Sequence, residues 1–193
     1  MLEKSNKCSN AVSYSAPVSK TDQIKKHIIH DMFFNLWYNV SMKIYFATDH
    51  AGFELRNTLI DFVRGLGYEV EDLGTKELDL DDDYTDFIAL AAEKISQNPT
   101  DKAIILGGSG QGEAMLANRF PNVRATVCYG GDDLLAEKII TLSREHNDAN
   151  ILSFGARFIS SDQAKHLTQL WLETSLSDDS KYLRRIQKAE SIK

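Results

Sequence analysis

A glycine-rich segment in the middle of the chain holds the residues whose types and spacing are best suited to chemistry. It reads Gly107-Gly108-Ser109-Gly110-Gln111-Gly112-Glu113, and it follows an apolar stretch, Ala103–Leu106, that is typical of a buried strand. Glycines let main-chain amides approach a ligand closely, and a helix expected over Ala114–Asn118 would begin there with unpaired N–H groups. Glu113 adds a carboxylate beside these amides. A base next to an oxyanion cradle is the pairing needed to remove a proton adjacent to a carbonyl group and to stabilise the enediolate that forms.

The spacing of this loop does not match the two best-known nucleotide-binding loops. It is not Gly-x-Gly-x-x-Gly, it follows the third expected strand and not the first, and no Gly-Lys-Ser/Thr completes a phosphate-binding P-loop. A glycine-rich loop taken alone is more often a flexible turn between a strand and a helix. Glu113 is the feature that favours a site over such a turn.

Asp49 and His50 form a second polar group, at the end of the strand expected over Lys43–Thr48. Because the carboxyl ends of parallel strands meet at one edge of a sheet, these side chains are directed toward the same edge as the glycine-rich loop. Asp49 is also a good helix N-cap residue, since its carboxylate accepts hydrogen bonds from the first helical amides. Both roles stay open for Asp49.

A third group, Ser143-Arg144-Glu145-His146-Asn147-Asp148, lies between a helix and the strand that begins near Ile151. Taken alone it is a helix end and a turn, where a histidine is more often structural or solvated. A helix-to-strand turn lies at the amino edge of its sheet, opposite the ligand edge, so His146 would reach a site most easily by crossing to another subunit. We therefore expect a homodimer with shared active sites.

The elements that must position these residues alternate between strand and helix patterns from Met42 onward, where the pattern changes abruptly and where the original start could lie. Residues 1–41 are expected to be a peripheral or partly disordered extension with a candidate helix over Asp22–Tyr38, and residues 42–193 a single domain. The alternation predicts an α/β fold: a three-layer αβα sandwich around a Rossmann-like, doubly wound, five-stranded parallel sheet. Strands are expected at Lys43–Thr48, Tyr68–Leu73, Ala103–Leu106, Ala125–Tyr129 and Ile151–Phe154, and further helices at Phe53–Leu66, Tyr84–Ser96, Asp132–Leu142, Asp162–Trp171 and Ser177–Lys193. The first helix should place Leu55, Leu59, Phe62, Val63 and Leu66 on one apolar face.

Composition excludes several classes of protein. The net charge of -6 argues against wholesale nucleic-acid binding, which needs a concentrated excess of Lys and Arg. The apolar stretch around residues 32–40 is too short and too interrupted to span a membrane, and the first forty residues do not follow the order of a signal peptide. Cys8 and Cys128 suggest no disulfide framework, so a reducing compartment, the cytoplasm, is the simplest expectation.

Together and in this order, the motifs resemble the family that holds ribose-5-phosphate isomerase B and the galactose-6-phosphate isomerase subunits. The resemblance runs from Met42 to about Ile192. It implies an enzyme without a cofactor that interconverts D-ribose 5-phosphate and D-ribulose 5-phosphate through a cis-enediol, a step of the pentose phosphate pathway. The motifs that carry it are Asp49-His50-Ala51-Gly52-Phe53, Asp83-Tyr84, the loop from Gly107 to Glu113, Ser143 to Asp148, and Phe154-Gly155-Ala156-Arg157.

The family has two branches that differ in the catalytic base. One uses a Cys at the position matching Gly107, and the other, often called mycobacterial-type, uses a Glu at the position matching Glu113; this sequence is similar to the second. The resemblance implies that Glu113 moves the proton between C1 and C2, that Ser109 and the loop amides hold the enediolate oxygen, and that His146 opens the furanose ring. Cys128 does not match the catalytic Cys, and we expect it in the core.

The resemblance also implies the residues that hold the substrate. Sugar hydroxyls would contact Asp49, His50, Tyr84 and Asn147, and the phosphate would contact Arg157, Lys181 and Arg185, some of them from the neighbouring subunit; the loop residues Gly108, Gly110, Gln111 and Gly112 complete the set. Lys181 stands where the related pattern often has Arg, so bidentate phosphate contact would be lost there. Thr85 stands where Pro is common. No metal is expected, because the spacing of His, Cys and carboxylates lacks a ligand set.

Three further possibilities stay open at the level of sequence. The substrate could be a six-carbon sugar phosphate, galactose 6-phosphate or allose 6-phosphate, because one added carbon alters pocket length and not the reaction. The chain could instead be a noncatalytic phosphate- or nucleotide-sensing module, which would have no need of Glu113 and His146 facing one pocket. Dimers could also pair into tetramers.

Overall fold

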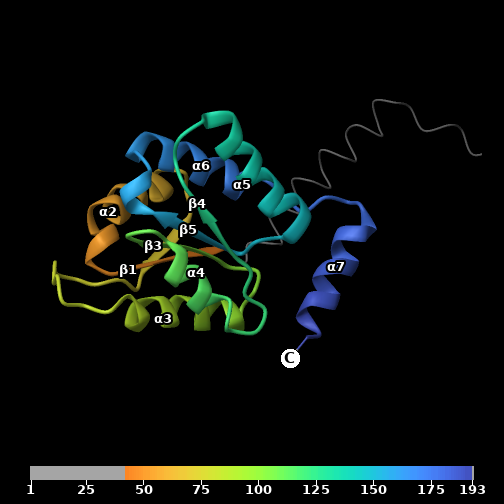
Figure 1. The fold of residues 1–193 in the computed structure, drawn as a ribbon, viewed down its shortest axis with the longest axis horizontal. Helices are drawn as coiled ribbons and strands as arrows, with labels where there is room; N and C mark the ends of the chain where they lie inside the picture. The colour runs from red at the N-terminus through yellow and green to blue at the C-terminus, as the bar shows by residue number, and fades with distance from the viewer. Residues whose placement is uncertain (1–41, 193) are drawn as a thin grey trace, which may run out of the picture. The chain divides into compact units, whose positions relative to one another are not determined.

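Five parallel strands form one sheet in the order β2-β1-β3-β5-β4 in the computed structural model, which describes residues 42–192 (Figure 1). Residues 1–41, with the helix expected over Asp22–Tyr38, lie outside the described residues. The strands are β1 (Lys43–Thr48), β2 (Glu69–Asp72), β3 (Lys102–Gly107), β4 (Ala125–Cys128) and β5 (Ile151–Gly155). The predicted fold class is confirmed.

The helices cover both faces of the sheet (Figure 1), as expected when right-handed crossovers run toward both of its edges. Connections that run toward one edge of the sheet place their helix on one face, and connections that run toward the other edge place it on the opposite face. One face carries α2 (Phe53–Gly65), α5 (Asp133–Asn147) and α6 (Ser161–Glu173); the other carries α3 (Tyr84–Gln97) and α4 (Gln111–Ala117). Two short 3-10 turns, η1 (His50–Gly52) and η2 (Ala156–Phe158), follow β1 and β5, and α7 (Ser180–Glu190) ends the described chain.

The core consists of two apolar layers, one on each face of the sheet. Ile44, Phe46 and Ile104 face the layer that α2, α5 and α6 cover, where Trp171 is fully buried. Alternate residues of the same strands face α3 and α4. Strand β3 is buried along its whole length, as expected of a central parallel strand covered on both sides.

Three sequence predictions about the helices were wrong in detail. Leu66 is 38% exposed, because α2 ends at Gly65 and the chain turns away at Gly67, whose φ is +93°. Helix α4 begins at Gln111 and not at Ala114, so Glu113 lies in its first turn. Helix α5 continues to Asn147, well beyond the expected end at Leu142.

The extra turn of α5 is held by a buried arginine that also fixes the chain after it. The Arg144 side chain donates from Nε to the carbonyl of Thr174 (3.0 Å) and from Nη1 to Asp148 (2.7 Å) and to the carbonyl of Ala149 (2.6 Å). These bonds satisfy the carbonyl of Ala149, in the turn into β5, and that of Thr174, directly after α6. The motif that the sequence indicated as a helix end and a turn is therefore mostly helix.

Candidate active site

The candidate site lies beyond the carboxyl ends of β1 and β3, which are neighbours at the centre of the sheet. From β1 the chain goes to one side of the sheet to form β2, and then to the other side to form β3. Ligands of doubly wound folds bind at this kind of switch point, because the loops there diverge to opposite faces and leave a crevice. Asp49 and His50 follow β1, and the glycine-rich loop follows β3.

Contacts with β5 and η2 hold the glycine-rich loop. The carbonyl of Gly110 accepts a hydrogen bond from Ser153 Oγ (2.7 Å), and the carbonyl of Gly108 accepts one from the amide of Arg157 (3.3 Å). Gly110 has φ +72°, a left-handed conformation that favours glycine. Within residues 42–192, the amides of Ser109 and Gly110 donate no hydrogen bond. The loop thus presents main-chain donors of the kind an oxyanion requires.

Glu113 is buried, with 5% of its surface exposed, and its carboxylate lies directly against the main chain of Gly107. A Cβ atom placed on Gly107 would lie 1.6 Å from Glu113 Oε1 and 2.1 Å from its Cδ. Burial raises the pKa of Glu113, a hydrogen bond with its own main chain opposes the rise, and the charge of Asp49 adds to it. The result is a desolvated carboxylate whose proton affinity is higher than that of an ordinary glutamate.

An open cavity of about 380 Å³ borders this carboxylate. Arg157 reaches over the loop, where a Cβ atom placed on Gly108 would lie 3.2 Å from the guanidinium carbon. A carboxylate, main-chain donors and a cation therefore meet in one cavity. Its lining consists of Tyr84, Gly108, Ser109, Gly112, Glu113, Arg157 and Phe158.

A second cavity of about 550 Å³ adjoins the first, since Ser109 and Phe158 line both. Gln111 Nε2 donates to the hydroxyl of Tyr129 (2.7 Å) in its wall, and Tyr129 packs edge-on against Phe158 with ring centroids 5.6 Å apart. Gln111 thus faces this second, more apolar space, and not the space in front of Glu113.

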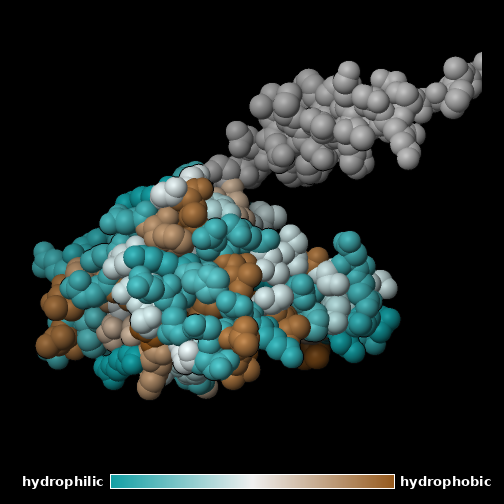
Figure 2. Space-filling model, turned by 90° about the horizontal axis from the view of Figure 1, so that it is seen from above, coloured by the Kyte–Doolittle hydropathy of each residue, from teal (hydrophilic) through white to brown (hydrophobic). Residues whose placement is uncertain are grey.

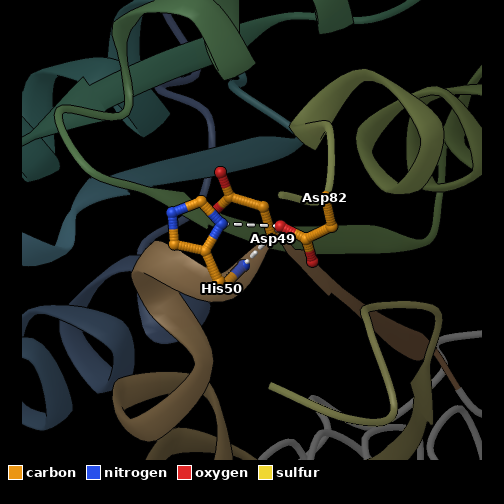
Figure 3. A group of neighbouring side chains, drawn as sticks. All are labelled: Asp49, His50 and Asp82. Carbon is orange, nitrogen blue, oxygen red and sulfur yellow. Dashed lines mark hydrogen bonds and ion pairs between the residues drawn. The ribbon is translucent and has the colours of Figure 1, made fainter. Parts of the chain in front are cut away.

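His50 is hydrogen-bonded to Asp82, and Asp49 lies beside this pair (Figure 3). Asp49 is 7% exposed and caps η1 by accepting from the amide of Ala51 (3.0 Å), so the N-cap role weighed for it is present. Asp82 Oδ1 accepts from the amide of His50 (3.1 Å) and lies 2.7 Å from His50 Nδ1. The hydrogen bond with Asp82 raises the pKa of His50, and the charge of Asp49 acts in the same direction.

The same three side chains bring one potential ligand atom each to within 4.8 Å of one another, a spacing that could hold a metal ion. In this arrangement Asp49 Oδ1 and Asp82 Oδ1 already accept hydrogen bonds, and Nδ1 of His50 donates one. The His50–Asp82 pair is thus held by its own hydrogen bonds, and Asp49 by its bond to the Ala51 amide.

Four predicted residues lie away from Glu113 within this chain. His146 and Asn147 end α5 at the amino edge of the sheet, as the sequence indicated for His146. The His146 ring stacks on Tyr182 of α7, with centroids 4.0 Å apart. Lys181 Nζ pairs with Asp179 (2.6 Å), and Arg185 lines a separate cavity of about 480 Å³ with Asn147.

Sequence reasoning missed three residues that the structure brings to the site. Asp82 is one of several neighbouring aspartates in the stretch 79–83, and nothing in that run distinguishes it. Phe158 directly follows Arg157 in η2, and Tyr129 directly follows β4, so their positions at strand ends were the available signal. Cys128 is buried, as expected.

Comparison with known proteins gives one consistent result. The sequence model of the family described as Ribose/Galactose Isomerase matches residues 44–189. The chain is 33% identical over 145 residues to ribose-5-phosphate isomerase B of Mycobacterium tuberculosis, covering 75% of this chain and 86% of the relative. It is similar to the structure of ribose-5-phosphate isomerase B from Clostridium thermocellum, with TM-score 0.71, 35% identity, and coverage of 78% of this chain and 97% of the other. It is also similar to the Mycoplasma genitalium enzyme with bound ribulose-5-phosphate, with TM-score 0.72, 30% identity, and coverage of 78% and 95%. The chain therefore belongs to the Ribose/Galactose Isomerase family.

Proposed function

We propose that residues 42–193 form a sugar-phosphate isomerase domain, with residues 1–41 as an extension, and that it interconverts D-ribose 5-phosphate and D-ribulose 5-phosphate. The observation that carries this proposal is the buried carboxylate of Glu113 in a cavity lined by Ser109 and Arg157. The relatives named as ribose-5-phosphate isomerase B, and the bound ribulose-5-phosphate in one of them, support the choice of substrate.

In the proposed reaction, Glu113 removes a proton from the carbon next to the carbonyl group and returns it to the neighbouring carbon. The negative charge that develops on oxygen meets the Ser109 hydroxyl and the free amides of Ser109 and Gly110. Burial supports the role of Glu113, because a raised pKa brings a carboxylate closer to the proton affinity that a general base needs at neutral pH. Arg157, at the rim of the same cavity, supplies a cation for the phosphate.

The position of Glu113 supports the Glu-base branch of the family. A side chain on residue 107 would have to begin where Oε1 of Glu113 now lies. A Cys at position 107 and a Glu at position 113 would therefore deliver their reactive atoms to nearly the same place, and the two branches would share one reaction geometry. Because this chain has Gly107 and not a Cys at that position, Glu113 takes the role of the catalytic base.

Replacing Glu113 by Gln tests the assignment, because it keeps the shape of the side chain and removes the base. We expect kcat to fall by about 10²- to 10⁴-fold, the usual contribution of a general base. Deuterium exchange from solvent into C2 of the sugar should fall in parallel. Glu93→Gln is the matched control, since Glu93 is exposed on α3. Near-normal turnover in Glu113→Gln would overturn the proposed role.

A homodimer with shared sites is the second part of the proposal. Within the chain, His146 stacks on Tyr182, and Asn147 and Arg185 line a cavity other than that of Glu113, so the site lacks its predicted ring-opening residue. Apolar side chains are exposed near the site: Met115 is 67%, Phe158 58% and Leu134 77% exposed. Figure 2 shows such apolar patches interrupting a largely hydrophilic surface. A second copy that covers them could deliver His146.

Mixing two inactive variants tests this sharing. Glu113→Gln and His146→Asn homodimers should each be inactive, whereas hybrids contain one site with both residues intact. Unfolding and refolding the mixture should recover about a quarter of the parent activity if the subunits pair at random, half of the dimers being hybrids with one working site. Refolded single variants are the controls, and no recovery would indicate a site built within one chain.

A six-carbon sugar phosphate is the alternative that a specific feature favours. The cavity of about 550 Å³ beside Ser109 and Phe158 offers room for a longer substrate. Comparing kcat/KM for five- and six-carbon phosphates decides between them, because specificity is the difference in transition-state binding. Absence of exchange at C2 with every sugar phosphate would instead favour the noncatalytic sensor.

We also propose the cytoplasm as the location of the enzyme. The support is the scarcity of cysteine and the absence, within residues 42–192, of any helix long and apolar enough to cross a membrane. Cell fractionation with an antibody to the chain tests this.

A further inference from the structure

Asp82 is a nearly buried carboxylate that the proposed reaction leaves without a role. Its side chain is 9% exposed, although it lies in a loop of otherwise exposed aspartates that includes Asp81 and Asp83. Oδ1 makes two contacts with one residue, the amide of His50 at 3.1 Å and its Nδ1 at 2.7 Å. Within the described part of the chain, Oδ2 is buried without a hydrogen-bond partner.

These two contacts orient the imidazole ring. A carboxylate oxygen accepts hydrogen bonds, so Nδ1 must carry the hydrogen that it shares with Asp82. Figure 3 shows the second ring nitrogen, Nε2, on the side of the ring away from Asp82. Rotation of the ring would break the bond at Nδ1, whereas the bond to the main-chain amide keeps the carboxylate itself in place.

The charges around the ring favour its protonated form. The charged groups that face His50 are Asp82 from the loop before α3, Asp49 at the end of β1 and Arg157 from η2. The hydrogen bond with Asp82 raises the pKa of His50 most, the charge of Asp49 adds to the rise, and partial burial and Arg157 oppose it. An imidazolium also compensates the charge of Asp82, half of which lies on an oxygen without a partner.

We propose that Asp82 is a positioning residue that acts through His50: it holds Nδ1 and favours the protonated ring, so that Nε2–H donates to an oxygen of the sugar phosphate. The inference rests on the proposed function, since it gives His50 a defined chemical state in that site. It separates two properties of Asp82. The acceptor oxygen orients the ring, and the negative charge sets its protonation.

Two substitutions distinguish these properties. Asp82→Asn keeps an acceptor oxygen for the His50 amide and for Nδ1–H but removes the charge, and Asp82→Ala removes both. Asp81→Asn is the matched control, because it removes a neighbouring carboxylate that is exposed. Thermal unfolding of each variant reports whether the fold is intact.

The first readout is the titration of the His50 ring by NMR, which needs no isomerase activity. We expect the His50 pKa to fall in Asp82→Asn while the hydrogen stays on Nδ1, and we expect the Nδ1 preference to be lost in Asp82→Ala. Asp81→Asn should leave both properties unchanged. An unchanged His50 titration in Asp82→Asn would overturn the proposal, whether or not the protein isomerises ribose 5-phosphate.

The second readout is KM as a function of pH. With Asp82→Asn, KM should match the parent at acidic pH and rise at a lower pH than in the parent, as the ring loses its proton sooner. With Asp82→Ala, KM should rise about 10-fold at all pH values, the usual effect of losing a hydrogen bond to a charged group. In a His50→Asn background, Asp82→Ala should have no further effect on KM. A full additional effect there would overturn the proposal, because Asp82 would then act by another route.

Discussion

Replacing Gly107 by Ala should displace the carboxylate of Glu113, the proposed catalytic base, without changing residue 113 itself. The added Cβ would lie 1.6 Å from Glu113 Oε1, whereas ordinary contact begins near 3.4 Å, so the carboxylate must withdraw by roughly 1.8 Å. Only the end of a flexible side chain is in the way, so the main chain can stay in place. Overpacking of this kind costs about 1–3 kcal/mol of stability, which a folded domain tolerates.

The expected loss of activity follows from that displacement. A misplacement of about 1 Å at a reacting group can cost about 100-fold in rate, equivalent to about 2.7 kcal/mol of transition-state stabilisation. We therefore expect kcat for ribose 5-phosphate to fall at least about 100-fold in Gly107→Ala. KM should change much less, because Arg157 and the phosphate are not displaced.

Gly65→Ala is the control for adding a methyl group. A Cβ atom at Gly65, the last residue of α2, meets nothing within 4 Å, so this change should leave kcat unaltered and raise stability by up to about 1 kcal/mol. Steady-state kinetics and thermal unfolding should be measured on both variants. A Gly107→Ala protein that is folded and keeps kcat within a few-fold of the parent would refute the reasoning, since the carboxylate would then not be needed where it lies.

Four further predictions concern charges and a thiol. Because burial raises the pKa of Glu113, the acid limb of the kcat/KM profile should lie at higher pH than an ordinary glutamate would produce. Because the pKa of Glu113 is raised in the folded state, the parent protein loses stability as the pH rises through that pKa. The unfolding free energy of Glu113→Gln should therefore increase relative to that of the parent from acidic to neutral pH. Parallel plots of unfolding free energy against pH for the two proteins would contradict this. Burial raises the pKa of Cys128 to about 12, so this thiol should resist thiol reagents at pH 8 until the protein unfolds, and Cys128→Ala should keep kcat. Rapid labelling of native Cys128 would argue against it. Arg144→Ala should lower the unfolding free energy by about 1–3 kcal/mol in urea, because it leaves the carbonyl groups of Ala149 and Thr174 without their Arg144 donor while Asp148 keeps its bond to Arg124; a loss below about 0.5 kcal/mol would show that water replaces the guanidinium.

Much of the fold was predictable because its signals are local. The run Ala103–Leu106 is apolar throughout, as a strand buried on both faces must be, and β3 was found there. The alternation of strands and helices was enough to predict the parallel sheet with helices on both faces. The same alternation indicated that Asp49 and the glycine-rich loop lie at the same edge of the sheet, because the carboxyl ends of parallel strands meet at one edge.

Local signals failed where tertiary contacts decide the outcome. Leu66 continues the apolar period of α2, but the helix ends at Gly65 and the chain turns at Gly67 toward β2, which leaves Leu66 exposed. The end of α5 depends on Arg144, whose partners include Thr174, thirty residues away in the sequence. Neither result could be read from periodicity, because both depend on which surfaces meet after the chain folds.

For the site, residue types and spacing by themselves determined that a carboxylate, Glu113, stands beside main-chain donors. Only the tertiary structure decided that this carboxylate is buried against Gly107, and that Asp82, among several similar aspartates, faces His50. The physical reason is that burial and hydrogen bonding depend on distances between segments that lie far apart in the chain. A local sequence pattern carries the chemistry of a side chain, whereas its desolvation and its partners arise only when the sheet brings the strand ends together.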